Sequence, residues 1–178
     1  MIGITVERAH GEYDPGTSKF FGSPTMPEEW LGDGTVGDED FFFCQLRVSE
    51  FKGFDECGLA PQVGFIYFFL TFKDGKFIPN VRYCKDEPDT IIDDFNAGFD
   101  FLGDTDIEYS IDYCKKESAE DGTAILIDKG EDIILLQYDP LDDNMPSFLA
   151  NTEKIAYFTI KKEQLKTLDF SSVKFTIE

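Results

Sequence analysis

The clearest hydrophobic pattern in the chain is GFIYFFLTF at 64–72, where every residue after the glycine is apolar, aromatic or β-branched. A run without polar alternation is typical of a strand that is covered on both faces. Asp74-Gly75 follows directly, and an Asp-Gly pair between two apolar runs favours a type I′ hairpin turn. We therefore predict that 64–72 is the central strand of the domain and turns back into a second arm over 77–84.

The second arm contains Pro79, which has no N–H for a ladder hydrogen bond. That arm is therefore predicted to lie at an edge of the sheet or to carry a bulge. A helical turn is predicted to start at Ser49, a short helix to run from a cap at Asp89 through Phe95, and another to span 161–168. Further strands are predicted at the other apolar or alternating runs, 2–6, 41–48, 107–113, 123–128, 132–138, 155–160 and 173–177, with a hairpin across Lys129-Gly130.

These elements predict a single α+β domain over 1–178 with a mostly antiparallel, aromatic-rich sheet and one or two short helices. A chain of 178 residues is long enough to bury roughly 70% of its unfolded surface. Its 19 Phe and 7 Tyr indicate an aromatic sheet core. The segment 12–40 is rich in Gly, Pro, Asp and Glu and holds the only Trp, so we predict an irregular segment of the kind that often carries function.

Two stretches of the chain echo each other. Gln45 lies in an apolar strand 22 residues before Tyr67, and Gln137 lies in another 20 residues before Tyr157. Each unit reads apolar strand, Gln, polar excursion, then a strand with Tyr-Phe. The pattern indicates either an internal duplication or two strand pairs that merely share composition.

The charge of the chain narrows the classes of partner. Asp and Glu number 36 against 16 Lys and Arg, which gives a formal charge of −20. Such a charge disfavours binding to nucleic acid or anionic lipid, and it favours a basic protein partner or cations, or serves solubility alone. No apolar window is long enough for a membrane span, and MIGITVERAH lacks the pattern of a signal peptide. We therefore expect a cytoplasmic protein with reduced thiols at its four cysteines, which form no CxxC pair: Cys44, Cys57, Cys84 and Cys114.

Catalytic motifs are absent from the sequence. His10 is the only histidine, so any Ser-His or Cys-His pair would need it, and its context is that of an ordinary surface residue. The acidic stretch 139–144 could supply oxygen ligands for Ca²⁺ or form a solvated turn, and it lacks EF-hand spacing; the acids of 33–40 invite the same two interpretations. No cofactor or metal site is predicted. A hydrolase that uses acidic residues, with or without a divalent metal, remains the alternative function, although no spacing selects a carboxylate pair.

Five residues are candidates for a binding site. Gln45 and Gln137 lie inside apolar strands, where an amide is unfavourable unless it finds hydrogen-bond partners. They either clamp the adjoining loops or line a pocket. Pro24, Pro27 and Trp30 either shape an exposed aromatic surface for a partner or place the Trp as a lid on the core.

An ordered set of motifs resembles the YwqG-like family, a bacterial domain of unknown function, over roughly 20–178. Two residues depart from the family pattern, Phe21 in place of a glycine and Leu31 in place of a proline, and a helical N-terminal extension and a Gly-Tyr-Pro segment are missing. The motifs are Gly22-x-Pro24-x-x-Pro27-x-x-Trp30, Cys44-Gln45-Leu46, Pro61-x-x-Gly64, Ile66-Tyr67-Phe68-Phe69, Leu135-Leu136-Gln137-x-Asp139, Tyr157-Phe158-x-Ile160, Leu165 and Leu168-Asp169-Phe170-Ser171.

The resemblance implies an α+β domain dominated by antiparallel sheet. Some members of the family are encoded beside secreted polymorphic toxins, which implies a role as an immunity or accessory protein. Together with the acidic charge, this predicts a non-enzymatic protein-binding domain, an immunity-type protein that neutralises a toxin with a basic surface. The sequence does not predict an oligomeric state.

Overall fold

The computed structural model describes residues 1–10, 14–88, 90–118, 122–148 and 153–178. Within them, no helix has both the length and the apolar character needed to cross a membrane. The strands are β1 (Ile2–Arg8), β2 (Lys19–Phe20), β3 (Asp40–Arg47), β4 (Phe65–Lys73), β5 (Lys76–Cys84), β6 (Tyr109–Lys115), β7 (Ala124–Asp128), β8 (Asp132–Tyr138), β9 (Ala156–Lys161) and β10 (Lys174–Ile177). The helices are α1 (Glu29–Gly32), α2 (Val48–Phe51) and α3 (Lys162–Lys166), with 3₁₀ turns η1 (Lys52–Phe54) and η2 (Asp100–Leu102).

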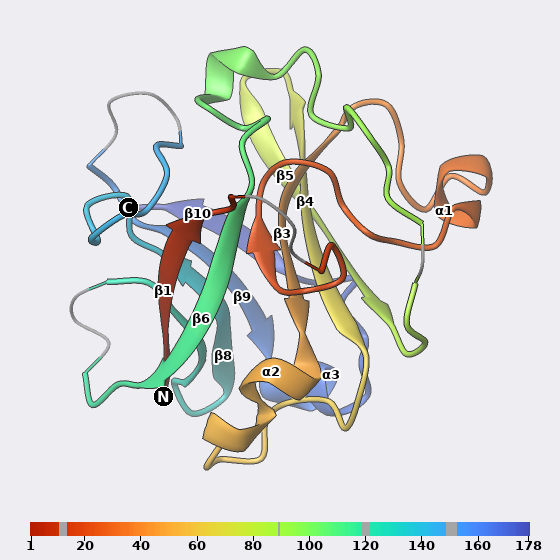
Figure 1. The fold of residues 1–178 in the computed structure, drawn as a ribbon. Helices are drawn as coiled ribbons and strands as arrows, with labels where there is room; N and C mark the ends of the chain where they lie inside the picture. Colours follow the sequence, from red (N-terminus) through yellow and green to blue (C-terminus); the bar gives the residue numbers. More distant parts are fainter. Residues whose placement is uncertain (11–13, 89, 119–121, 149–152) are drawn as a thin grey trace.

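All these strands belong to one antiparallel sheet in the order β10-β9-β8-β7-β1-β6-β2-β3-β4-β5. The sheet curls until its two edge strands approach each other, and the rings of Phe77 in β5 and Phe175 in β10 meet with centroids 5.8 Å apart (Figure 1). In the described residues no ladder joins these edges, so the domain is a nearly closed barrel. The α+β prediction is therefore only partly right: the sheet is as expected, but the helices are single turns within connections and form no layer of their own.

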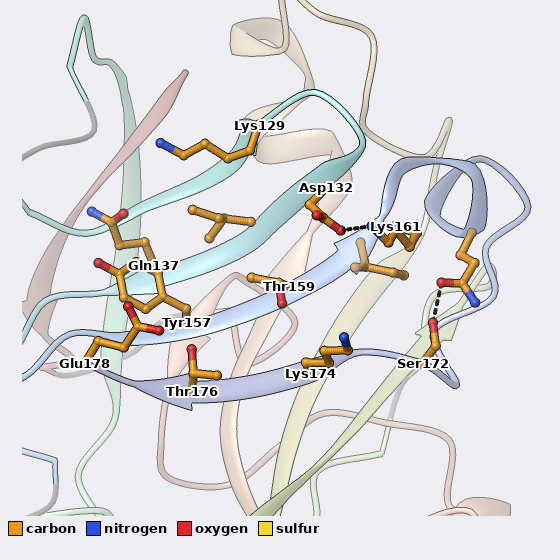
Figure 2. A pocket seen from close by; sticks show the side chains of 13 residues that line it. Lys129, Asp132, Gln137, Tyr157, Thr159, Lys161, Ser172, Lys174, Thr176 and Glu178 are labelled. Atoms are coloured by element: carbon orange, nitrogen blue, oxygen red, sulfur yellow. Dashed lines mark hydrogen bonds and ion pairs between the residues drawn. The ribbon is translucent and has the colours of Figure 1, made fainter.

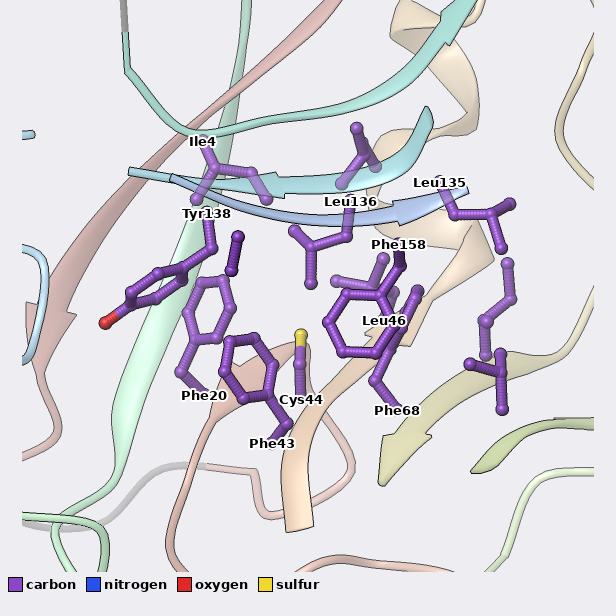
Figure 3. Packing of buried hydrophobic residues seen from close by; sticks show 14 of the residues in the cluster. Ile4, Phe20, Phe43, Cys44, Leu46, Phe68, Leu135, Leu136, Tyr138 and Phe158 are labelled. Atoms are coloured by element: carbon purple, nitrogen blue, oxygen red, sulfur yellow. The ribbon is translucent and has the colours of Figure 1, made fainter. Parts of the chain in front are cut away.

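The core lies inside the curl of the sheet and is mainly aromatic. Phe43 and Tyr138 pack edge to face at 5.2 Å, and Phe68 meets Phe158 at 5.0 Å. Figure 3 shows these rings converging on the buried Cys44 from strands on opposite sides. Edge-to-face contacts place the positive edge of one ring against the negative face of another, so this core gains more than apolar burial alone.

The sheet consists of two halves with equivalent strand order, one on each side of a central strand pair. β1 and β6 pair at the middle; we name β2–β5 the first half of the sheet and β7–β10 the second half. Gln45 lies opposite Tyr67 in the first half, and Gln137 lies opposite Tyr157 in the second. In both halves the ladder shifts register just before the glutamine, between Phe42 and Cys44 and between Ile134 and Leu136. The two halves thus repeat each other residue by residue around the Gln–Tyr pairs.

The hairpin prediction is confirmed. Asp74 and Gly75 both have positive φ, 52° and 72°, as a type I′ turn requires, and they join β4 to β5. β5 is an edge strand, which suits Pro79. The predicted central position of 64–72 is wrong: β4 is second from the edge, because the middle of the sheet is taken by the β1–β6 pair.

The predicted helices were right at two places and wrong at one. The turn from Ser49 appears as α2, and 161–168 contains the shorter α3. Asp89 lies outside the described residues, and the rest of the predicted helix through Phe95 is not helical: Ile91 forms an antiparallel bridge with Thr25 instead. Backbone groups spent on that bridge are not available to a helix. The irregular segment 12–40, described from residue 14 onward, contains β2 and α1.

Candidate binding surfaces

Two segments, 22–40 and 86–106 (residue 89 is not described), pack against the first half, and we call them the cover. Met26, Val36, Trp30, Ile92 and Phe95 lie against the outer face of the sheet, while Phe99 and Leu102 join the core inside it. The backbone N–H of Thr25 donates to Gln45 Oε1 at 3.0 Å, and the Tyr67 hydroxyl donates to the Thr25 carbonyl at 2.7 Å. Met26 and Val36 are buried against the aromatic side chains of this face. The Gln–Tyr pair therefore holds both backbone polar groups of one residue of the cover, Thr25.

Gln45 also holds the chain that leads into β2. Its Nε2 donates to the Thr17 carbonyl at 2.8 Å and to the Pro15 carbonyl at 3.3 Å. The side chain is fully buried. Because water cannot reach its amide group, these bonds supply the hydrogen-bond partners that the amide needs. In this geometry the amide acts as a clamp on loops rather than as part of an open pocket.

The second segment of the cover is fastened to the first and to the sheet. The backbone N–H of Ile92 donates to the Pro24 carbonyl at 2.9 Å. The buried Asn96 pairs its amide with the backbone of Phe42, accepting at 2.8 Å and donating at 2.9 Å, and also donates to the Thr105 carbonyl at 3.0 Å. The sequence analysis did not predict this role of Asn96. The only indication in the sequence is that Asn96 is a single amide among aromatic residues in an acidic stretch.

The three N-terminal candidates lie within the cover. Trp30 is half-buried, with its ring edge to face on Tyr67 at 5.2 Å. Pro24 is buried and Pro27 half-buried. Trp30 therefore lids the small aromatic cluster beneath it. The large apolar side chains of the cover that project into solvent are instead Leu31, Ile91 and Phe101, which are exposed by 43%, 43% and 57%.

The cover carries much of the negative charge of the chain. It contains six acidic residues in 22–40 and eight in 86–106, and no Lys, Arg or His. Basic residues of the neighbouring strands offset part of this charge, since Arg47 pairs with Glu87 and Arg82 lies near Asp33, but the two segments themselves contribute only negative charge. Of the thirteen acids that the structure describes here, twelve are exposed: Glu28, Glu29, Asp33, Asp38, Glu39, Asp86, Glu87, Asp93, Asp94, Asp100, Asp104 and Asp106.

The cover begins beside a buried ion pair that the sequence did not reveal. Lys19 Nζ lies 3.1 Å from Glu108 Oε1, and the Lys19 side chain is 1% exposed. Burial lowers the pKa of Lys19 to about 8 and raises the pKa of Glu108. Glu108 also accepts the backbone N–H of Ser23 at 3.0 Å. A Cβ on Gly22 would lie 1.9 Å from Glu108 Cγ, so glycine leaves room for this carboxylate.

Among the residues that the structure describes, no segment covers the outer face of the second half, and this face forms a pocket of about 610 Å³ (Figure 2). Its floor contains Ile134, Gln137, Tyr157 and Thr159 from β8 and β9, and Lys174 stands on β10. The reason is local, since β7 and β8 join through a tight turn at 129–131 instead of a long excursion like that between β2 and β3. We call this pocket the open face.

The rim of the open face carries three lysines, Lys129, Lys161 and Lys174, and two acids, Asp132 and Glu178. Lys129 and Lys174 have no ion-pair partner among the residues that the structure describes, whereas Lys161 pairs with Asp132 at 3.0 Å. Gln137 Nε2 donates to the Gly122 carbonyl at 2.8 Å. Burial, together with the charges of Glu178 and Asp139, raises the pKa of Tyr157. The Tyr157 hydroxyl therefore stays protonated and can donate a hydrogen bond.

The acidic clusters considered as Ca²⁺ ligands hold backbone instead. Asp139 accepts the N–H of Gly122 at 3.2 Å, and Asp142 accepts that of Thr123 at 2.6 Å. Asp40 similarly accepts from Gly37 N–H at 2.9 Å. Across the described ranges, no three His, Cys, Asp or Glu side chains are grouped as a metal site would need. His10 is exposed at the end of β1.

Comparison with known proteins gives no relative: no family model matches the chain, and no curated protein does. The two surfaces must therefore be interpreted from their own chemistry.

Proposed function

We propose that this protein is a non-enzymatic binding protein whose partner presents a basic surface, and that the cover makes the contact. The observation that carries the proposal is the joint presence of twelve exposed acids and three exposed apolar side chains, Leu31, Ile91 and Phe101, on segments that contain no basic residue. Exposed acids steer a basic partner and accelerate association. Apolar anchors at the centre of a contact supply most of its affinity.

An immunity-type role follows from the resemblance to the YwqG-like family, and we propose membership of that family on the same grounds. The equivalent placement of Gln45 with Tyr67 and of Gln137 with Tyr157 supports the motif assignment. It also supports an internal duplication, in which β1 and β6 are exchanged between the halves: β1 pairs with β7, and β6 pairs with β2. Composition alone would not place both register shifts at matching positions.

The hydrolase alternative has no specific observation in its favour. Asp40, Asp139 and Asp142, which the sequence offered as ligands, accept backbone N–H groups, and Asp132 at the open face pairs with Lys161.

The experiment compares two variants of equal charge. Asp93, Asp94, Asp100 and Asp104 of the cover are changed to Asn in one variant. In the other, the same number of exposed acids away from the cover is neutralised, as Glu7→Gln, Asp74→Asn, Asp112→Asn and Glu117→Gln. A partner captured from a bacterial extract by the wild type is then purified for rate measurements.

We expect the cover variant to associate about 10-fold or more slowly at low salt, and the matched variant to associate at nearly the wild-type rate. Phe101→Ser should mainly speed dissociation. If both charge variants associate equally fast, the acids of the cover serve solubility and the proposal fails.

A further inference from the structure

The open face repeats the device that holds the cover in the first half. There, Gln45 accepts the backbone N–H of Thr25, and Tyr67 donates to the Thr25 carbonyl. In the second half, Gln137 and Tyr157 lie directly opposite each other in the same register, and Figure 2 shows both at one end of the pocket. The Tyr157 hydroxyl has no hydrogen-bond partner among the described residues, although its counterpart Tyr67 donates to a peptide carbonyl.

We propose that the open face is a second binding site, separate from the cover, and that it takes an extended peptide segment of a partner protein. The segment carries one large apolar side chain flanked by acidic residues. Its backbone lies across β8 and β9, where the Tyr157 hydroxyl donates to one of its carbonyls. Its acidic residues meet Lys129 and Lys174.

The form of the occupant is taken from the first half, where the equivalent face is occupied by 22–40. That segment crosses the strands, buries Met26 between aromatic side chains and places Trp30 on Tyr67. It follows that a sheet face with this Gln–Tyr pair accommodates a crossing chain with apolar anchors.

The open face has room for such an anchor because its floor residues are smaller. Ile134 stands where the first half has Phe42, and Thr159 stands where it has Phe69, as the matched registers show. The resulting pocket of about 610 Å³ lies within the range of about 300–1,000 Å³ that is usual for ligand sites.

The charges of two lysines favour acidic residues on either side of the apolar anchor of the peptide. Lys129 and Lys174 are unpaired in the described part of the chain, and both stand at the rim of the pocket. The occupant of the first half is itself acidic, with six acids and no basic residue in 22–40. A segment of the same chemistry would place carboxylates beside these two ammonium groups, and it would be repelled elsewhere by the charge of the protein.

The polarity of the floor indicates that the partner binds reversibly. Phe42 and Phe69 are fully buried beneath the cover, so removing the cover would expose two aromatic rings to water. Thr159 in the floor is half-buried and tolerates water, as does Lys174 at the rim, so this face needs no permanent occupant.

The test uses a synthetic peptide with the sequence of residues 23–33, SPTMPEEWLGD, which is the acidic, apolar-anchored segment of the first half. Isotope-labelled full-length protein is titrated with this peptide, with a version in which its acids are amides, and with a scrambled version. We expect shifts in β8, β9 and β10 for the first peptide, with a Kd below about 1 mM, and much weaker binding of the other two.

Three variants locate the contact. Tyr157→Phe removes only the hydroxyl and should weaken binding about 3- to 10-fold. Lys129→Gln with Lys174→Gln should weaken binding and reduce its salt dependence. The matched double variant Lys73→Gln with Lys76→Gln, in the β4–β5 hairpin, should leave the Kd unchanged. Urea unfolding of each variant checks that the sheet is intact.

The proposal is overturned by no binding up to about 1 mM, by shifts confined to the cover, or by equal binding of the amide peptide. Equal shifts from acetyl-glutamate alone would also overturn it, because they would show a site for small anions. None of these outcomes bears on the cover, whose role is tested by the association rates of its own charge variants.

Discussion

Gln45 and Gln137 occupy equivalent places in the two halves of the sheet. Each lies opposite a tyrosine, and each amide nitrogen donates at 2.8 Å to a carbonyl in the loop before the first strand of its half, Thr17 or Gly122. The two halves differ in what lies on the outer face of the sheet above each glutamine. Gln45 also accepts from the cover, whereas Gln137 lines a pocket. The same strand arrangement thus serves stability in the first half, and in the second half it places the Tyr157 hydroxyl at the pocket where we propose binding.

Replacing Gln45 with Leu should lower the free energy of unfolding by about 1–3 kcal/mol, because the Thr25 N–H and the Thr17 carbonyl would stay buried without this partner. Urea unfolding measures the change. Gln62→Leu, at an exposed position, is the control and should stay within about 0.5 kcal/mol of wild type. Equal stability of the two variants would show that Gln45 is not a clamp.

Local rules explain which elements could be predicted from the sequence. The β4–β5 hairpin needs only Asp74 and Gly75 at positive φ, and an edge position for Pro79 follows from its missing N–H. The prediction that Gln45 needs buried partners was equally local. Each of these features depends on interactions between residues that lie only a few positions apart in the sequence, or on the chemistry of a single residue.

The rest depends on contacts between distant segments. The middle of the sheet is formed by β1 and β6, which have no stronger hydrophobic pattern than β4. Ile91 bridges Thr25 and so cannot belong to a helix, a fact that no local pattern contains. Composition gives a charge of −20, but only the fold gathers twelve exposed acids on the cover and leaves Lys129 and Lys174 at the open face.

The pair of Lys19 and Glu108 predicts a gain of stability in mild alkali. Burial lowers the pKa of Lys19 from its ordinary 10.5 to about 8. Between these values the unfolded chain binds more protons than the folded protein, so the free energy of unfolding rises with pH. From pH 8 to pH 10 we expect a gain of about 1–3 kcal/mol relative to the double variant Lys19→Met, Glu108→Gln. Parallel pH profiles of the two proteins in urea would contradict the assignment.

Above pH 10 the buried tyrosines should reverse this trend. Burial raises the pKa of the Tyr67 and Tyr138 hydroxyls well above the ordinary 10. The folded protein then keeps protons that the unfolded chain loses, so stability falls as pH rises past about 10. Tyrosinate absorbance and circular dichroism should therefore change together for these side chains. Ionisation of all seven tyrosines before the sheet melts would mean that they are not buried.

The concentrated charge of the cover predicts a stabilising effect of salt. Between about 0.01 M and 0.15 M NaCl the Debye length falls from about 30 Å to about 8 Å, which screens repulsion among exposed acids. The melting temperature should rise over this range. It should rise less in the cover variant, with Asn at Asp93, Asp94, Asp100 and Asp104, than in the variant with four neutralised acids elsewhere. Identical salt responses would show that the charge is evenly spread.

Gly64, just before β4, should resist any side chain. Its φ is 98°, and a Cβ there would lie 2.3 Å from the Cys84 carbonyl oxygen. Gly58 also has a positive φ, 65°, but the space around it is open. Alanine at Gly58 therefore introduces only backbone strain, of about 1 kcal/mol, whereas alanine at Gly64 adds a clash with backbone that cannot move without opening the β4–β5 ladder. Gly64→Ala should thus be less stable than Gly58→Ala by about 1–3 kcal/mol in urea unfolding, and equal losses would mean that the strand start can shift to make room.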